Sequence, residues 1–254
     1  MKPNQHRQPQ AMVTSERAIR FDFGSSINQK TYQDIQQFCR FIERDVQPLL
    51  EEVVPSMNTV TVFYRRKLVN PEAIIEDIQK KWANGTDKEL LASSRLIDIP
   101  VCYDPAFSED MQRIMEHTGL TRDEIIALHT GTCYTVYMIG FLPGFPYLGD
   151  LPNALHVPRL AKPRLRVPKG TVGIGGTQTG IYPIESPGGW NIIGRTPLDL
   201  YSLQRVDPFL IRAGDRLVFR AISLEVFEDM KNQLEREPER IQQFVKEDAS
   251  CELI

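Results

Sequence analysis

Hydrophobic and polar positions in the first part of the chain alternate between the period of a strand and the period of a helix. Residues 18–24 place Ile19, Phe21 and Phe23 between polar neighbours, which predicts a half-buried strand. From Thr31 to about Leu50, apolar residues recur every three or four positions. Because this spacing gathers them on one side of a helix, the segment is predicted to be an amphipathic helix.

A second strand and a second helix follow. Residues 59–64 are β-branched and aromatic, which favours a strand. Asn70 and Pro71 then supply an N-cap and a first-turn proline, and Gly85 provides the C-terminal stop of a helix. A third strand is predicted near residues 95–101. The alternating order of strands and helices indicates a small α+β layer.

The second part of the chain changes from helices to strands. Residues 108–117 have helical spacing, and Thr121 to Glu124 form a capping box before another helix. The segment from Cys133 to about Ser223 then holds most of the 16 glycines and more than half of the 18 prolines. Proline removes a hydrogen-bond donor and glycine raises the entropy lost on ordering, so helices do not persist there. We predict a closed or nearly closed β-sheet with long loops.

The predicted fold class is therefore α+β, with four segments along the chain. Residues 1–16 are polar and are predicted to be a flexible extension. Residues 17–94 form the small α+β domain, and residues 95–226 form the β-barrel domain. Residues 227–254 are acidic and are predicted to be a solvated helical tail, broken at Pro238.

Composition limits the classes of function. The 254 residues are 41% hydrophobic and 25% charged, as in ordinary globular proteins. The net charge of −3 excludes a general polycation for nucleic acid or acidic lipid. No stretch approaches the roughly 18 apolar residues of a membrane span, and the polar N-terminal residues lack the apolar core of a secretion signal. The four cysteines are scattered without metal-ligand spacing, so we predict a cytoplasmic protein without a structural metal.

The loops between Gly140 and Pro197 carry more than turn chemistry. Turns explain their glycines and prolines but not the accompanying aromatic, Gln and Arg residues. Aromatic walls with a few fixed polar groups are typical of a small-ligand pocket, so we predict that these loops form one concave face. The candidates to line it are Phe141, Phe145, Tyr182, Ser186, Gly188, Gly189 and Trp190.

Four charged or titratable side chains are candidates for chemistry. Arg164, Arg166 and Arg195 can grip a carboxylate or a phosphate through paired hydrogen bonds, or they can form surface ion pairs of little value. His129 ends a predicted helix and is a candidate acid–base group, with a structural role at the helix end as the alternative. The Gly173–Gly176 cluster lacks the spacing of a dinucleotide fingerprint, so no phosphate cradle is predicted.

Long stretches of this region resemble a known family. They are EIIALHTGTCYTVYMIGF at 124–141, GFLPGFPYLGDL at 140–151 and PRLRVPKGTVGIGGTQTGIYPIESPGGWNIIGRTP at 163–197. All three resemble the KipI/PxpB family, which includes the B subunit of bacterial 5-oxoprolinase, an inhibitor of a sporulation histidine kinase, and parts of allophanate hydrolase and urea carboxylase. The resemblance covers about residues 96–222 and implies a cyclophilin-like β-barrel after a small α+β domain.

The resemblance also implies an activity and partners. In the 5-oxoprolinase branch, ATP drives the opening of 5-oxo-L-proline to L-glutamate. The chain is then expected to act with subunits A and C, to share or leave ATP binding to a partner, and to be inactive alone. Two alternatives stay open: a KipI-like inhibitor of a sensor histidine kinase, and a subunit associated with allophanate hydrolase or urea carboxylase.

Under the 5-oxoprolinase interpretation, the site must hold a carboxylate and a developing phosphate and must exclude water. Arg164 and Arg195 are the expected anion clamps, and Tyr182 and Trp190 are the expected walls. His129 is the expected acid–base group. The expected hydrogen-bond donors to a developing oxyanion are Gln178, Thr179 and the backbone N–H groups of Gly188 and Gly189.

Overall fold

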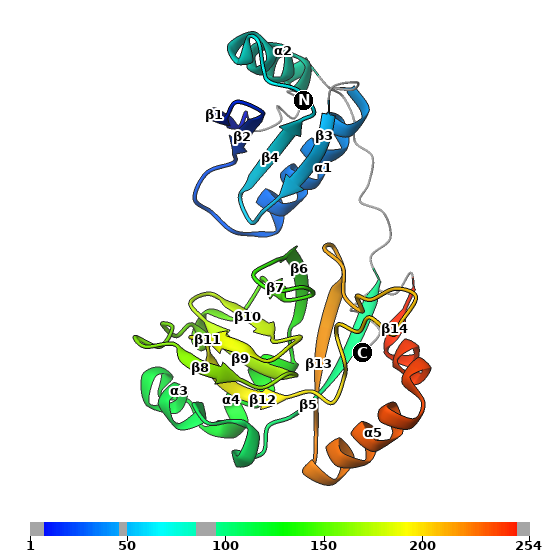
Figure 1. The fold of residues 1–254 in the computed structure, drawn as a ribbon. Helices are drawn as coiled ribbons and strands as arrows, with labels where there is room; N and C mark the ends of the chain where they lie inside the picture. Colours follow the sequence, from blue (N-terminus) through cyan, green and yellow to red (C-terminus); the bar gives the residue numbers. More distant parts are fainter. Residues whose placement is uncertain (1–7, 46–49, 85–94, 248–254) are drawn as a thin grey trace, which may run out of the picture. The chain divides into compact units, whose positions relative to one another are not determined.

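The computed structural model describes residues 8–45, 50–84 and 95–247 (Figure 1). The chain divides into two compact units, Met1–Ala92 and Ser93–Ile254, each with its own hydrophobic core. The helix stop predicted at Gly85 lies outside the described residues. Among the residues described, no helix is both long enough and apolar enough to cross a membrane.

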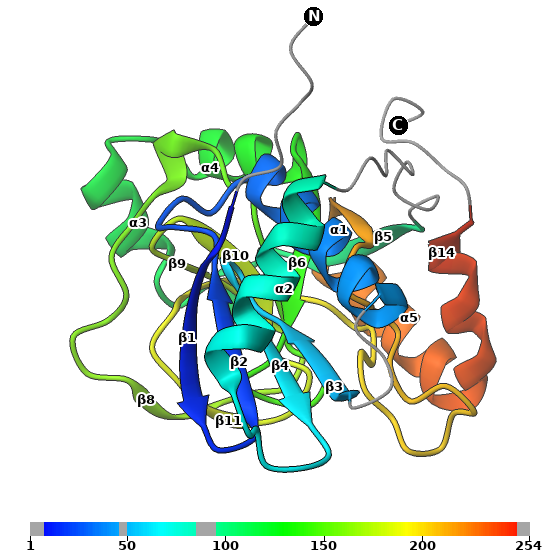
Figure 2. The ribbon, with the colours of Figure 1, turned by 90° about the horizontal axis from the view of Figure 1, so that it is seen from above.

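The N-terminal unit is a four-stranded antiparallel sheet with two helices (Figure 1 and Figure 2). Its elements are β1 (Gln10–Ser15), β2 (Ala18–Asp22), α1 (Gln29–Asp45), β3 (Leu50–Pro55), β4 (Thr59–Tyr64) and α2 (Pro71–Asn84). The strand order is β1-β2-β4-β3. Both helices contribute to one core, in which the ring of Phe38 lies 4.9 Å from that of Phe21 and 5.2 Å from that of Trp82.

Two predictions for this unit are wrong at the sheet edges. The flexible extension predicted over residues 1–16 contains β1, which pairs with β2. The sequence predicts a helix that extends to about Leu50, but Leu50 begins β3, and the described part of α1 reaches Asp45. Both strands lie at an edge and have largely exposed side chains, so neither segment needs a strong apolar alternation.

The C-terminal unit is built on a β-barrel. The strands follow one another in the order β12-β9-β10-β7-β6-β13-β5, and a pairing of β12 with β5 closes the ring. Strands β8 and β11 form a separate two-stranded ribbon. The strands are β5 (Leu96–Cys102), β6 (Cys133–Ile139), β7 (Pro146–Leu148), β8 (Arg164–Val167), β9 (Thr171–Gly175), β10 (Gln178–Ile181), β11 (Ser186–Gly188), β12 (Asn191–Arg195) and β13 (Arg216–Ile222).

Two short helices, α3 (Met111–Thr118) and α4 (Arg122–Thr130), precede the second barrel strand. Gly119 ends α3 in the left-handed conformation, with φ of 74°. The predicted capping box is present: the Thr121 side chain accepts from the Glu124 N–H, and the Glu124 carboxylate accepts from the Thr121 N–H. These caps determine where each helix begins or ends. They therefore also determine where the last turn of α4 enters the barrel core.

The acidic C-terminal segment is part of the barrel core. It contains α5 (Leu224–Arg236), the 3-10 helix η3 (Pro238–Phe244) and β14 (Val245–Lys246), which pairs with β5. The helix ends before Pro238 as predicted, and its side chains are largely solvent-exposed, but buried residues anchor the segment to the barrel. Phe227, Ile241 and Phe244 are buried, and the last two belong to the main core. Burial of apolar side chains anchors the segment despite its charge.

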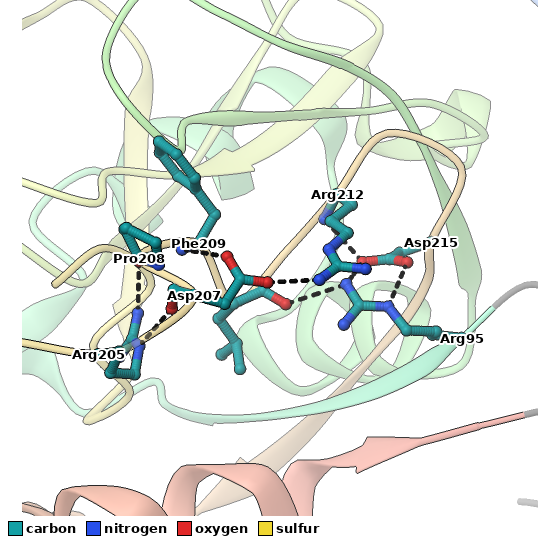
Figure 3. A network of polar contacts seen from close by, with 8 residues as sticks. Arg95, Arg205, Asp207, Pro208, Phe209, Arg212 and Asp215 are labelled. Atoms are coloured by element: carbon teal, nitrogen blue, oxygen red, sulfur yellow. Dashed lines mark hydrogen bonds and ion pairs between the residues drawn. The ribbon is translucent and has the colours of Figure 1, made fainter. Parts of the chain in front are cut away.

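Arginines fasten the long loop between β12 and β13 (Figure 3). Arg95 forms a buried ion pair with Asp215 at 2.6 Å and donates to the Leu210 carbonyl at 3.2 Å. Arg205 donates to backbone carbonyls of the same loop, and Arg212 pairs with Asp207. These arginines are committed to structure, because their donors satisfy the carbonyls and carboxylates of the loop.

Candidate functional site

The loops predicted to form one face surround a hollow of about 330 Å³ beside the β8–β11 ribbon. Its volume lies at the small end of the range for small-molecule sites. The lining residues are Phe141, Phe145, Tyr147, Arg159, Leu160, Pro163, Tyr182, Pro187, Gly188, Gly189 and Trp190. We call this hollow the aromatic pocket.

The aromatic side chains of the pocket form one cluster around Phe145. The Phe145 ring lies 5.2 Å from that of Tyr182 and 5.5 Å from that of Trp190, both nearly edge to face. Phe141 and Tyr147 contact the same ring at 5.7 and 4.9 Å. Such contacts hold flat apolar walls in fixed orientations. The aromatic residues of the loops, though far apart in the sequence, thus gather around one hollow, whereas other predicted members of that face, such as Ser186 and Arg195, do not line it.

Glycines allow the walls to approach the backbone closely. Gly175 and Gly180 lie under the indole of Trp190, at distances that leave no room for a side chain. A β-carbon on Gly188 would overlap the hydroxyl of Tyr182. Burial raises the pKa of the same hydroxyl, and the nearby backbone of Trp190 acts to lower it. The positions of Gly175, Gly180 and Gly188 in the sequence are therefore explained by contact with aromatic rings and not by phosphate binding.

We expect Gly188→Ala to damage the pocket without unfolding the barrel. The new methyl group must displace the Tyr182 ring, so the stability loss should be about 1–3 kcal/mol while ligand binding is largely lost. Gly189→Ala is the matched control, because a β-carbon there meets no atom closer than 3.6 Å. Melting temperature and ligand binding measured on both variants check the expectation. Equal effects of the two substitutions would contradict it.

Arg159 is a pocket residue that the sequence pattern did not indicate. Its guanidinium carbon lies 5.3 Å from the centre of the Trp190 ring, in a cation–π contact. Its electrostatic field lowers the pKa values of Tyr147 and Tyr182, although burial raises both of them overall. Arg159 and Trp190 are distant in sequence, so no local pattern could have indicated this contact. The pocket is thus aromatic with one cation among its lining residues.

His129 lies in the barrel core and does not line the pocket. Its ring is fully buried and stacks on Phe219 at 4.3 Å between centroids. Thr179 donates to the Gly173 carbonyl at 3.1 Å and therefore accepts from His129 Nε2 at 3.0 Å. The other ring nitrogen, Nδ1, accepts from the Tyr103 hydroxyl at 2.7 Å. Burial lowers the pKa of His129 to about 3, so this geometry favours the structural alternative.

Arg164 is neutralised by two acids. Its Nη2 atom lies 2.7 Å from an oxygen of Asp110, and its Nε atom lies 3.3 Å from Glu109. The second oxygen of Asp110 accepts from the Ile192 N–H at 2.7 Å. The group therefore ties the start of α3 to β12, two residues beyond Trp190. This geometry supports a positioning role for Arg164 and not the expected anion clamp.

The two other predicted clamps also lie outside the aromatic pocket. Arg166 is largely exposed and pairs with Glu185 at 2.7 Å, which is the surface alternative. Arg195 donates to the Lys169 carbonyl at 2.9 Å and lies over the ring of Phe107. It lines a separate hollow of about 950 Å³ beside α5. Neither side chain is placed to hold a ligand of the aromatic pocket.

Some of the predicted oxyanion donors line the aromatic pocket and others do not. Gln178 and Thr179 are buried in β10 and do not line the pocket, and Thr179 is occupied by His129 and Gly173. Ser186 is buried in β11 and donates weakly to its neighbour's carbonyl at 3.2 Å. Of the predicted site residues, the pocket brings together Phe141, Phe145, Tyr182, Gly188, Gly189 and Trp190.

Comparison with known proteins places the chain among carboxyltransferase-like proteins. The family model described as "Carboxyltransferase domain, subdomain C and D" matches residues 9–211. The 5-oxoprolinase B subunit of Escherichia coli O157:H7 is 46% identical over 176 residues, which are 68% of this chain and 78% of that protein. The 5-oxoprolinase B subunit of Bacillus subtilis (strain 168) is 37% identical over 217 residues, 81% of this chain and 90% of that protein.

Solved structures extend the likeness of fold. The crystal structure of Kluyveromyces lactis urea carboxylase matches 97% of this chain with a TM-score of 0.76 and 17% identity, and this chain spans 24% of that one. Another solved chain, at 33% identity and a TM-score of 0.67, matches 82% of this chain, which spans 40% of it. The predicted α+β fold with a barrel is thus confirmed.

Proposed function

Because the chain belongs to the carboxyltransferase subdomain C and D family, in its KipI/PxpB branch, we propose that it is the B subunit of a heteromeric, ATP-dependent 5-oxoprolinase. In this role it opens 5-oxo-L-proline to L-glutamate together with subunits A and C, in the cytoplasm. Relatives named as B subunits match most of the chain and most of their own length, which supports a subunit role in an enzyme.

The aromatic pocket is the observation that carries this proposal. All of its lining residues lie within the stretch that the family model matches. 5-oxoproline is a small, flat ring with one carboxylate, and a pocket of about 330 Å³ with aromatic walls suits such a ring. The walls also shield the faces of a bound ring from bulk water.

Bound in the assembled enzyme, ATP would supply a phosphoryl group to activate the lactam oxygen, because an unactivated lactam is a poor electrophile. In the described parts of the chain, the glycine cluster at 173–176 does not fit a phosphate cradle. Gly173 and Gly175 of this cluster lie in β9 and pack against Asn191 and Trp190. We therefore assign ATP binding to a partner subunit, and to this chain the binding and shielding of the lactam.

The alternative functions share the same pocket. A KipI-like inhibitor would use this face to contact a kinase, and a subunit associated with urea carboxylase would serve another substrate. The urea carboxylase structure is only 17% identical, so it shows a common fold and supports no shared substrate. The identity to 5-oxoprolinase B subunits is higher and favours the lactam.

Reconstitution tests the proposal. We expect no ATP-dependent formation of glutamate from 5-oxoproline by this chain alone, and robust formation when candidate subunits A and C are added. The expected dependence arises because this chain offers a ligand pocket but no phosphate site among its described residues. Glutamate release and ADP release are measured together, with urea as the control substrate. Turnover by the chain alone would contradict the division of labour, and turnover of urea instead of the lactam would overturn the function.

A further inference from the structure

Arg159 is the cation of the aromatic pocket that is left without an acidic partner. Within the described parts of the chain, Arg164 pairs with Asp110 and Arg166 with Glu185, whereas no ion pair of Arg159 is found. Arg159 is exposed, and its contact with the pocket is to the face of Trp190. A cation–π contact uses no N–H donor, so the guanidinium keeps its donors for a ligand.

The pocket thus combines one positive charge, that of Arg159, with apolar aromatic walls. A ligand that lies against Trp190 and Tyr182 meets aromatic surface, and any anionic group at its edge can reach Arg159. A guanidinium binds a carboxylate through two parallel hydrogen bonds, which fixes orientation as well as position. An ammonium group on the ligand would be repelled by Arg159, which already occupies the face of Trp190 where a cation would be attracted.

We propose that Arg159 binds the substrate carboxylate and makes the pocket selective for a cyclic amide acid over free amino acids. This inference rests on the proposed function. In 5-oxoproline the nitrogen is an uncharged amide, so the molecule has one carboxylate and no cation. Proline and glutamate carry an ammonium group, which the pocket disfavours. Ring opening creates that ammonium group from the lactam nitrogen, so the same arrangement promotes release of the product.

Direct binding to the full chain tests the inference independently of turnover. The fluorescence of Trp190 reports occupancy, with Trp82→Phe as the background because the chain has two tryptophans. We expect 5-oxoproline to bind saturably, and Arg159→Met to weaken this binding roughly 10- to 100-fold, as for loss of a hydrogen-bonded charge. 2-Pyrrolidinone, the same ring without the carboxylate, should bind equally to both proteins. Arg159→Lys should restore part of the affinity, because charge returns without the planar fork.

Lys162→Met is the matched control. Lys162 is an exposed cation three positions further along the same loop and does not line the pocket. It should change the dissociation constant for 5-oxoproline less than twofold. An equal effect of Lys162→Met and Arg159→Met would mean that Arg159 acts only through long-range electrostatic attraction, as any nearby cation would. This result would overturn the inference.

Competition with proline and glutamate tests the selectivity. Each should bind at least tenfold more weakly than 5-oxoproline to the wild-type chain, and equal affinity would refute the role in discrimination. Reconstituted turnover without a 5-oxoproline effect on Trp190 would overturn the inference and leave the proposed function standing. Binding of 5-oxoproline that depends on Arg159, without turnover in any assembly, would support the inference and overturn the proposed function.

Discussion

Lowering the pH from about 7.5 to about 4.5 should reduce the free energy of unfolding of the barrel unit by about 2–3 kcal/mol through His129 alone. Burial lowers the pKa of this ring from its usual value of 6.5 to about 3 in the folded protein. Between these values the unfolded chain binds a proton that the folded chain does not. Stability is therefore complete above the unfolded pKa and is lost as the pH falls.

The surroundings of His129 explain why the ring stays neutral. Tyr103, directly after β5, and Tyr134 in β6 face it, and burial raises the pKa values of both phenols, so neither supplies an anion to stabilise an imidazolium. Thr179 Oγ1 accepts the Nε2 proton, and Nδ1 is occupied as an acceptor. Protonation of Nδ1 would break its bond from Tyr103 and leave a buried charge.

Urea unfolding at several pH values, followed by Trp190 fluorescence in the Trp82→Phe background, measures this loss. Carboxyl groups whose pKa values are lowered, such as those of Glu124 and Asp207, stabilise the fold fully above their usual pKa values. They lose this contribution as the pH falls below those values, and so mostly outside this range. His117→Gln, near the end of α3, should keep the wild-type pH dependence. His129→Gln should flatten it. If that variant does not fold, the pH dependence of the imidazole NMR resonances of the wild-type protein tests the expectation instead. A titration of His129 above about pH 5 would contradict it.

Sequence pattern was sufficient for elements whose own residues carry the signal. The alternation of Ile19, Phe21 and Phe23 and the capping box at Thr121 depend only on near neighbours, and the structure contains both. The strand β1 takes its hydrogen bonds from β2, and Phe244 is buried by strands far away in the chain. Such elements are determined by tertiary contacts, which a local pattern does not contain.

The same distinction between local pattern and tertiary contacts applies to the candidate site. Aromatic and glycine residues of the loops could be assigned to a pocket from composition, because few other roles require both together. The roles of the arginines could not, since an arginine serves as an ion-pair partner or as a ligand group according to which acid lies beside it. Asp110 neutralises Arg164 from 54 positions away, whereas Arg159 meets the face of Trp190. Only the folded chain distinguishes these cases.

Asp110→Ala should destabilise the barrel unit by about 2–4 kcal/mol and also disturb the aromatic pocket. The Asp110 side chain is 9% exposed and accepts from both the Arg164 guanidinium and the Ile192 N–H at 2.7 Å. Its removal leaves a partly buried cation and a buried backbone donor without their acceptor. The expected loss lies below that of a fully buried pair, because the Arg164 side chain is 26% exposed and Glu109 is a second acid.

Glu109→Ala is the matched control for Asp110→Ala, because it removes an acid that contacts the same guanidinium from a position 58% exposed. It should cost less than about 1 kcal/mol. Asp110→Asn keeps an acceptor for Ile192 but not the charge, so its loss should lie between the two. Trp190 lies two residues before Ile192, and a shift of β12 changes the wall of the pocket. Denaturant unfolding and 5-oxoproline binding are therefore measured on the same preparations. A large stability loss from Glu109→Ala, or none from Asp110→Ala, would show that the start of α3 is not held to β12 by this carboxylate.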